Sequence, residues 1–341
     1  MLALHQQRSP TPVLLDCDTG IDDALALIYL AGLHRAGRIT LVGVSCSAGN
    51  TTAKQSAINT AFILRSCGLA EEEIPIRIGP RQPLAVPLCT TPETHGPTGL
   101  GYCHAPEPQP GVIPEDPDTW QHLWDETWGT YGQDLRLIIT GPATALAQYL
   151  KRKPTVMPRT TMMGGAYLYR GNTTPTAEWN SWVDPHAAKE IFAPTSPFGS
   201  QRENSLITVC SLEVTEQFCC HPHHLEHLCQ LLGSTPIARD LPDILRFYFE
   251  FHRAQGEGYL AQIHDLLTCM VALDAIPVSS IDTTVDVEAD SPLLRGTTVA
   301  DYRHHWGRPA NARLITDVNL EQAYTHWWES ASMLGSQVFF R

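Results

Sequence analysis

Four aspartates lie close together near the start of the chain and could together bind a cation. Asp16, Asp18, Asp22 and Asp23 fall within eight residues. Carboxylates this close repel one another, and removing them from water is costly, so a fold that gathers them usually supplies a cation or shares protons. Calcium takes about six to eight oxygen ligands in irregular geometry, whereas magnesium needs near-octahedral order and keeps its waters. The cluster therefore favours calcium over magnesium.

The residues around these aspartates predict a strand, a turn and a helix. Apolar Val13 to Leu15 is typical of a short buried strand, Gly20 marks the turn, and Ala24 to Leu33 has apolar residues at helical spacing. Side chains alternate along a strand, so the first two aspartates point the same way. The last two open the helix, where its dipole favours negative charge. A solvated acidic turn that only caps the helix is the alternative, but this context favours a site.

Composition limits the classes of protein to which the chain can belong. Its 341 residues are 43% hydrophobic, enough for one large or two modest domains. With 23 basic and 36 acidic residues the net charge is −13, which argues against nucleic acid or an anionic membrane as a partner. Because no apolar run approaches roughly 20 residues and residues 1–11 lack the apolar core of a secretory signal, we expect neither a spanning helix nor such a signal. We expect a cytoplasmic protein with one domain over residues 12–341 and a flexible tail over residues 1–11.

The cysteines predict neither a disulfide framework nor a zinc site. Ten cysteines in a chain of this length are sparse, and none forms a CxxC pair, so we expect reduced packing residues. The segment from Cys219 to His227 holds two cysteines and four histidines. Adjacent residues rarely point at one centre, and this spacing matches no standard zinc pattern. We therefore interpret the segment as the polar start of a helix.

Alternating strand-like and helix-like segments predict an α/β fold with an open, mostly parallel, Rossmann-like sheet flanked by helices. The proline- and glycine-rich residues 83–118 predict a long loop that lines or covers a site. Asp184 is placed to cap a helix that starts at Pro185, and Pro142 fits the first turn of another. After the opening strand and helix, we predict strands at 39–45, 75–79, 135–140, 161–165 and 205–210, helices at 51–64, 120–129, 143–150, 242–262, 266–273 and 320–334, and a small β-hairpin at 285–299.

Polar side chains follow the ends of several predicted strands. Asp18, Asn50, Thr140 and Met163 come directly after strands, and so does the segment 172–180. In parallel α/β sheets, ligands bind beyond the carboxyl ends of the strands. We therefore expect these scattered residues to converge on one pocket.

The stretch from Asp16 to Ala24 closely resembles the N-terminal DxDxGxDDA signature of the inosine/uridine-preferring nucleoside hydrolases. The resemblance extends from Val13 to about residue 335. Eight further motifs occur in the order that the family has them: Gly49-Asn50, His95-Gly96, Thr140-Gly141-Pro142, Met162-Met163-Gly164-Gly165, Asn172, Glu178-Trp179-Asn180, Asp184-Pro185 and His264-Asp265.

This resemblance implies calcium-dependent hydrolysis of the N-glycosidic bond of ribonucleosides to ribose and free base, in nucleoside salvage or catabolism. The implied calcium ligands are Asp18, Asp23, the backbone carbonyl of Thr140, and Asp265. Asp18 also takes the proton from the metal-bound water that attacks the anomeric carbon. His264 is the candidate acid near the departing base.

The resemblance also implies the residues that hold the sugar. The resemblance gives Asp16 no role in metal binding or catalysis, and we expect it to support the loop after the first strand as a hydrogen-bond acceptor. The family forms homodimers or homotetramers, which we expect here. The implied substrate contacts are Asp22 and Asn180 at the ribose hydroxyls, Asn172 and Glu178 at the 5′-hydroxyl, Asn50 and Met163 along the sugar, and His95 in the glycine-rich loop.

The chain departs from the family pattern in two places. The family usually has His-Asp-Pro and Gly-Pro-Leu-Thr-Asn, where this chain has Leu266 after Asp265 and Gly141-Pro142-Ala143-Thr144-Ala145. Neither change removes an implied ligand. The aromatic segment 247–252, together with Tyr259, lies where the family builds its base pocket, and we expect Tyr248 or Tyr259 to contact the base. The preference for purine or pyrimidine stays open.

Three other functions are alternatives to this one. A haloacid-type phosphatase also begins with a strand-end DxD, but needs Thr or Val where this chain has Gly20. An EF-hand loop needs Glu at its twelfth position, which counted from Asp16 is Leu27. A nucleoside-binding protein without turnover stays open, although all four implied metal positions are present.

Overall fold

The structure is a computed structural model that describes residues 9–70, 72–153, 157–199 and 206–336. The first eight residues of the expected tail lie outside the described residues. The first strand, β1, begins at Thr11, which pairs with Ile39. Thr11 therefore belongs to the sheet.

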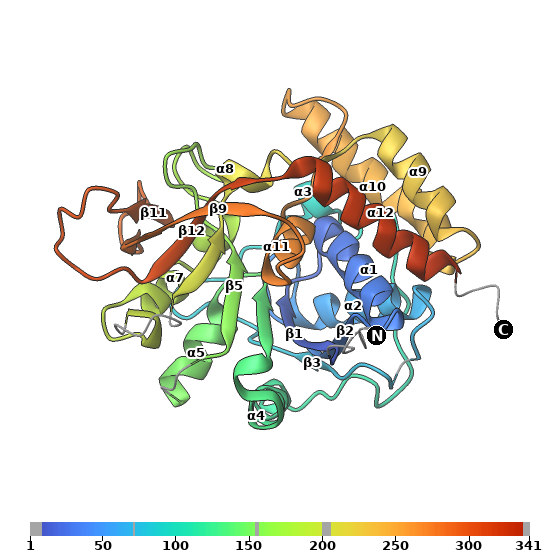
Figure 1. Cartoon of the computed structure of the whole chain (residues 1–341), viewed down its shortest axis with the longest axis horizontal. Coiled ribbons are helices and arrows are strands. Elements are labelled where there is room, and N and C mark those ends of the chain that lie inside the picture. The colour runs from blue at the N-terminus through green and yellow to red at the C-terminus, as the bar shows by residue number, and fades with distance from the viewer. Residues whose placement is uncertain (1–8, 71, 154–156, 200–205, 337–341) are drawn as a thin grey trace, which may run out of the picture.

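An eight-stranded sheet forms the middle layer of the molecule (Figure 1). Its strand order is β3-β2-β1-β4-β5-β6-β12-β9, and neighbours are parallel except for β9, which runs antiparallel to β12. This confirms the mostly parallel α/β sheet. Its strands are β1 (Thr11–Cys17), β2 (Ile39–Cys46), β3 (Ile76–Ile78), β4 (Arg136–Ile139), β5 (Arg159–Met163), β6 (Ile207–Cys210), β9 (Val278–Thr283) and β12 (Ala312–Val318).

Helices cover both faces of this sheet (Figure 1). One apolar core contains residues of α1, α2, α9, α10, α11 and α12, and the other contains residues of α4, α5 and α7. The helices are α1 (Ile21–Arg35), α2 (Ala53–Ser66), α3 (Pro92–His95), α4 (Thr119–Tyr131), α5 (Thr144–Arg152), α6 (Trp179–Val183), α7 (Pro185–Phe192), α8 (Leu212–Thr215), α9 (Pro222–Leu232), α10 (Pro236–Ala254), α11 (His264–Ala272) and α12 (Leu320–Ser336), with short 3-10 turns at Gly132–Asp134 and Pro197–Gly199.

The order of the strands reverses at β1, and this leaves a crevice at the carboxyl ends of β1 and β4. β1 pairs with β2 on one side and with β4 on the other. The helix after β1 packs in one core and the helix after β4 packs in the other, so the two connections leave the sheet toward opposite faces. Such a switch point is where open α/β sheets bind ligands.

Two small antiparallel sheets accompany the main one. The predicted hairpin is confirmed as β10 (Val285–Glu288) paired with β11 (Thr297–Ala300). The other sheet pairs β7 (Cys219–Cys220) with β8 (Ala261–Gln262). The expected long loop at residues 83–118 is also confirmed, with the short helix α3 inside it.

Some predicted boundaries were wrong. The helix expected at 242–262 is α10, which begins at Pro236 and ends at Ala254, because a buried apolar face keeps it helical on both sides of Pro242. Pro142 lies before the N-cap residue Ala143, outside the first turn of α5. The strands β9 and β12 were not predicted at all. Among the described residues, no helix is long and apolar enough to cross a membrane.

Candidate active site

A cavity of about 460 Å³ opens at the switch point of the sheet. Ten of the predicted site residues line it, which confirms that they converge although they come from segments far apart in the chain. They are Asp22, Asn50, His95, Thr140, Met163, Asn172, Glu178, Asn180, His264 and Asp265.

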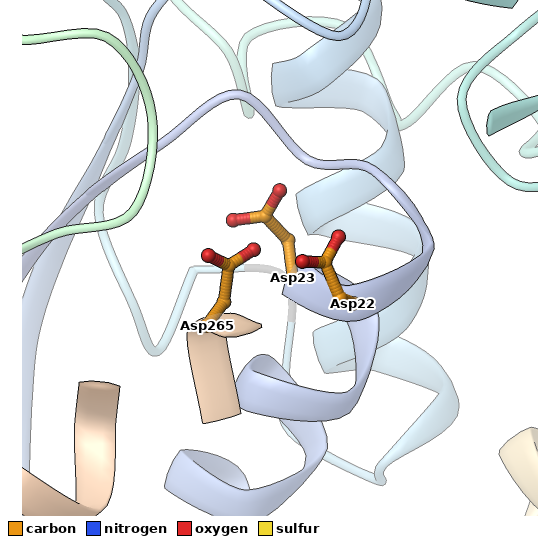
Figure 2. Close-up of side chains that lie close together, drawn as sticks. All are labelled: Asp22, Asp23 and Asp265. Atoms are coloured by element: carbon orange, nitrogen blue, oxygen red, sulfur yellow. The ribbon is translucent and has the colours of Figure 1, made fainter. Parts of the chain in front are cut away.

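Three carboxylates lie close together at this end of the sheet, and two of them, Asp22 and Asp265, line the cavity (Figure 2). Asp22 and Asp23 open α1 and Asp265 lies in the first turn of α11. Each offers an oxygen within 4.8 Å of the others, and all three are buried. Burial raises the pKa of each, that of Asp22 to about 7, and the neighbouring carboxylates raise the pKa of Asp265 further. Without a cation, this cluster would therefore hold protons near neutral pH.

Asp18 lies beside this group and has one oxygen without a hydrogen-bond partner. Its Oδ2 accepts a hydrogen bond from the backbone N–H of Asn50 at 2.6 Å. Its Oδ1 is buried and has no partner. Burial raises the pKa of Asp18 well above its usual value, and the charge on Asp23 adds to this. An unpaired buried carboxylate oxygen is costly unless a cation or a water binds it.

Asp23 joins the turn after β1 to the end of β4. Its Oδ2 accepts from the backbone N–H of Gly20 at 2.8 Å, and its Oδ1 accepts from the hydroxyl of Thr140 at 2.7 Å. The backbone carbonyl of Thr140 accepts from the side-chain amide of Asn180 at 2.7 Å. That amide also lies 3.5 Å from the sulfur of Met163. The oxygens expected to bind a metal are thus held in place by neighbouring side chains.

Asp16 does not line the cavity and supports the site from behind. It accepts hydrogen bonds from the hydroxyls of Ser45, at 2.5 Å, and Ser47, at 3.1 Å. Burial raises its pKa to about 7. Its backbone carbonyl accepts from the N–H of Thr140 at 2.8 Å. These contacts agree with the supporting role expected for Asp16, and the parallel register, which sets it beside Ser45, explains the first of them.

One side of the cavity is built by the connection between β5 and α6. Glu178 caps α6, because its carboxylate accepts from the backbone N–H groups of Gly165, Asn180 and Ser181 at 2.6 to 3.0 Å. The side-chain oxygen of Asn172 accepts from the N–H of Trp179 at 3.0 Å. The two residues expected at the 5′-hydroxyl are therefore both tied to the start of the same helix.

Two buried histidines lie on other walls of the cavity. The Nδ1 atom of His264 lies 2.9 Å from the hydroxyl of Thr215, and that of His95 accepts from the backbone N–H of Ile21 at 3.1 Å. Burial lowers the pKa of both imidazoles to about 3, and the nearby His252 contributes to this. Both are therefore neutral at pH 7 in the metal-free protein.

Sequence reasoning missed part of the cavity wall. Tyr248 lines the cavity, whereas Tyr259 does not and packs against Phe249. The signal for Tyr248 was in the sequence, because the aromatic residues of segment 247–252 are spaced so that several share one face of a helix. Other lining residues fall in segments that the sequence had placed at the site: Phe251 and His252 in the aromatic segment, Thr173 and Trp179 in residues 172–180, and Thr91, Glu93 and Thr94 in the long loop. The lining residues outside every segment predicted for the site are Arg170, Gly171, Gln255, Glu257 and Gln262.

The histidine-rich segment is the start of a helix, as expected. His221 is the N-cap residue of α9, and its backbone N–H donates to Nδ1 of His224. Within the ranges that the structure describes, the side chains that could hold a metal as a group of three or more are Asp22, Asp23 and Asp265. These donors are all oxygens, which suits a hard cation and not zinc.

Comparison with known proteins agrees with this geometry. The family described as inosine-uridine preferring nucleoside hydrolase matches residues 13–325. A relative from Shewanella sp. (strain ANA-3), named pyrimidine-specific ribonucleoside hydrolase RihA, is 33% identical over 314 residues, which are 90% of this chain and 92% of the relative. The protein of the same name from Salmonella paratyphi B is 30% identical over 312 residues, 90% of this chain and 94% of the relative.

Solved structures share the fold. A purine-preferring ribonucleoside hydrolase from Gardnerella vaginalis superposes with a TM-score of 0.82 at 24% identity, covering 96% of this chain and 99% of its own. A plant nucleoside hydrolase gives 0.79 at 23% identity, covering 95% and 99%. The fold is α/β, and its cavity lies beside an acidic cluster that could hold a metal ion. The chain belongs to the inosine-uridine preferring nucleoside hydrolase family and is an enzyme that hydrolyses ribonucleosides.

Proposed function

We propose that this enzyme works with a bound calcium ion held by Asp18, Asp23, the backbone carbonyl of Thr140, and Asp265. The observation that supports the proposal best is the unpaired, buried Oδ1 of Asp18 beside the buried carboxylates of Asp22, Asp23 and Asp265. An ion there would neutralise charges that otherwise repel one another. An all-oxygen donor set of mixed carboxylates and a carbonyl suits calcium.

We further propose that Asp18 is the general base of the hydrolysis. Bound calcium would supply a water of lowered pKa and a grip on the ribose hydroxyls. Asp18 accepts the proton of the attacking water, and its unpaired Oδ1 can take part without breaking a contact within the protein. The hydrogen bond from Asn50 to Oδ2 keeps the carboxylate oriented during this transfer.

The sugar would be held by side chains along the cavity. Asp22 and Asn180 bind ribose hydroxyls, Asn50 and Met163 line the sugar, and Asn172 and Glu178 lie at the 5′-hydroxyl end. Buried negative charge around the ring favours the positive charge that develops in an oxocarbenium-like transition state.

His264 is proposed as the acid that protonates the departing base, with His95 on the neighbouring wall. When the hydroxyl of Thr215 donates to Nδ1 of His264, the neutral imidazole carries its proton on Nε2. In that form Nε2–H can donate a hydrogen bond to a nitrogen or oxygen of the departing base, and the imidazolium form, which carries a proton on both nitrogens, can transfer one to the base and return to neutral imidazole.

We propose that pyrimidine ribonucleosides are the better substrates. The relatives with 30 to 33% identity quoted above are named pyrimidine-specific. The solved structures that share the fold are below 25% identity and carry no weight on this point. Release of ribose from uridine or cytidine no faster than from inosine or adenosine would contradict the preference.

A reducing-sugar assay on these four ribonucleosides tests the whole proposal. We expect ribose from at least one of them, its loss after dialysis against a chelator, and its recovery with calcium more than with magnesium. The variant Asp18→Ala should lose activity by at least about a thousandfold, the range seen when a catalytic base is removed. Equal activity in the Asp18→Ala variant would contradict the mechanism, and full activity in chelator would contradict the metal.

A further inference from the structure

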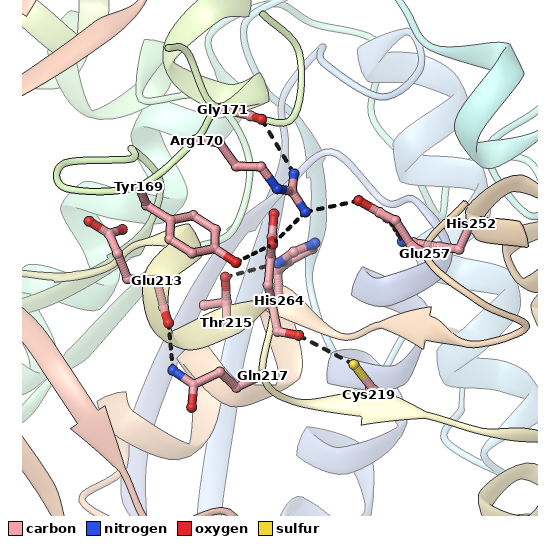
Figure 3. Close-up of polar contacts among 11 residues, drawn as sticks. Tyr169, Arg170, Gly171, Glu213, Thr215, Gln217, Cys219, His252, Glu257 and His264 are labelled. Carbon is pink, nitrogen blue, oxygen red and sulfur yellow. Dashed lines mark hydrogen bonds and ion pairs between the residues drawn. The ribbon is translucent and has the colours of Figure 1, made fainter. Parts of the chain in front are cut away.

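Arg170 joins three segments at the edge of the cavity (Figure 3). Its Nη2 lies 3.0 Å from Oε2 of Glu216 and 2.9 Å from Oε1 of Glu257. Arg170 belongs to the connection between β5 and α6, Glu216 follows α8, and Glu257 follows α10. One guanidinium group thus links the wall that contains Asn172 to Glu257, which also lines the cavity, and to Glu216, which lies outside the lining.

The first of these carboxylates is a fixed partner. The Glu216 side chain is only 5% exposed, and it also accepts a hydrogen bond from the hydroxyl of Tyr169 at 2.9 Å. A buried carboxylate is costly without a cationic partner, so Arg170 has a strong reason to stay beside it. Glu257 is more exposed, and its other oxygen lies 3.9 Å from Nε2 of His252, which lines the cavity.

The residues directly after Arg170 form a compact unit. The N–H of Gly171 donates to the carbonyl of Pro175 at 3.1 Å, and the N–H of Thr173 donates to the carbonyl of Ala177 at 3.2 Å. A Cβ at Gly171 would lie 2.2 Å from a backbone oxygen of Thr174, so this turn is tightly closed. Because the turn holds its own shape, its position in the cavity depends on the contacts that precede and follow it.

Helix α8 receives this segment and also contacts the proposed acid. Glu213 accepts from the backbone N–H groups of Tyr167 and Leu168 at 2.8 and 3.0 Å. Thr215, in the same short helix, contacts His264. Helix α8 therefore holds the segment that leads to Asn172, and the same helix contacts His264 through Thr215 (Figure 3).

We propose that Arg170 is a positioning residue for the hydrolysis. By pairing with Glu216 and Glu257, it holds Asn172 where the 5′-hydroxyl of the nucleoside binds. This inference rests on the proposed function, since it takes the cavity as the nucleoside site. Its effect falls on substrate binding, because the contact with the 5′-hydroxyl is made in both the bound ground state and the transition state.

Steady-state kinetics of Arg170→Met and Arg170→Lys with the best ribonucleoside test the proposal. We expect Arg170→Met to raise KM about tenfold with kcat changed less than about twofold, and Arg170→Lys to restore part of the loss. With the matching 5′-deoxyribonucleoside, the wild-type enzyme and Arg170→Met should have KM values within about twofold of each other. Glu257→Gln combined with Arg170→Met should add no further loss, because both changes break the same pair.

A matched control separates this role from general stability. Arg313 pairs with Asp282 through two hydrogen bonds of 2.7 and 2.9 Å at similar exposure, and neither residue lines the cavity. We expect Arg313→Met to leave KM unchanged. An unchanged KM in Arg170→Met, or an equal KM increase with the 5′-deoxy substrate, would overturn the inference. Failure of the proposed function looks different, because the wild-type enzyme would then release no ribose.

Discussion

At the scale of single residues, the site depends on how closely backbone approaches the carboxylates. Gly20 allows Asn50 and His95 to come near the turn after β1, since a Cβ there would lie 2.7 Å from a nitrogen of each side chain. At Gly49 the approach is closer still, because a Cβ would lie 2.0 Å from Oδ2 of Asp18. Space at these two glycines therefore decides where Asp18, Asn50 and His95 can lie.

Replacing Gly49 with Ala should disable the enzyme through Asp18. The added methyl cannot fit unless Asp18 or the backbone moves, so we expect kcat/KM to fall by at least about a hundredfold, the scale of loss from a small misplacement of a catalytic group. Gly129→Ala is the control, since nothing lies within 4 Å of its Cβ position in α4. Ribose release by the two variants checks this, and equal activity of Gly49→Ala and wild type would contradict it.

At the scale of secondary-structure elements, Asp184 shows that a helix cap can also connect elements. It caps α7 through a hydrogen bond from the N–H of Ala187 at 3.0 Å, as the sequence predicted. Its other oxygen accepts from the N–H of Leu84 at 2.9 Å and from the hydroxyl of Thr144 at 2.7 Å. The same carboxylate thus holds α5, α7 and the long loop together.

The variant Asp184→Ala should therefore lose more stability than the loss of a helix cap alone would cause. A lost cap costs about 1 kcal/mol, and leaving the buried hydroxyl of Thr144 unpaired costs about 1–3 kcal/mol, so we expect the free energy of unfolding to fall by about 2–4 kcal/mol. Urea unfolding measures it. Asp118→Ala is the control, because Asp118 is exposed at the N-cap of α4 and makes no capping hydrogen bond. A loss no larger than that of Asp118→Ala would show that the three contacts contribute little.

At the scale of the whole molecule, gathering carboxylates at the switch point makes the metal-free protein sensitive to pH. The folded-state pKa values of Asp16 and Asp22 are raised from 3.8 to about 7. Between about pH 4 and pH 7 the folded state then holds protons that the unfolded chain releases, so these groups make the free energy of unfolding fall as pH rises. Burial raises the pKa of the proposed calcium ligands Asp18, Asp23 and Asp265 in the same direction, and a cation bound to them would favour their ionised forms.

Calcium should therefore raise the melting temperature more at pH 7.5 than at pH 5.5. At low pH, protons compete with the ion for the same oxygens, whereas at high pH the ionised cluster gains most from it. Thermal unfolding in calcium and in chelator at both pH values measures the difference. Comparing the two conditions at one pH cancels the titration of distant groups, and an equal calcium effect at both values would rule out this linkage.

The sequence by itself determined the parts of the protein that depend on short spacing. The strand, turn and helix around Asp18 follow from local apolar patterns, and the parallel sheet follows from their alternation along the chain. The rule that ligands bind at the carboxyl ends of parallel strands then predicted that Asn50, Thr140 and Met163 would meet in one cavity. These inferences need only local periodicity and one rule of topology.

Contacts between segments that are distant in the sequence leave no local signal, and only the tertiary structure decided them. β12 has no pattern that identifies β6 as its neighbour, because the pairing depends on the space left at the edge of a sheet that is already formed. In the same way, nothing near Arg170 in the sequence indicates that Glu216 and Glu257 lie beside it. These carboxylates follow different helices, and the packing of α8 and α10 brings them to one guanidinium group.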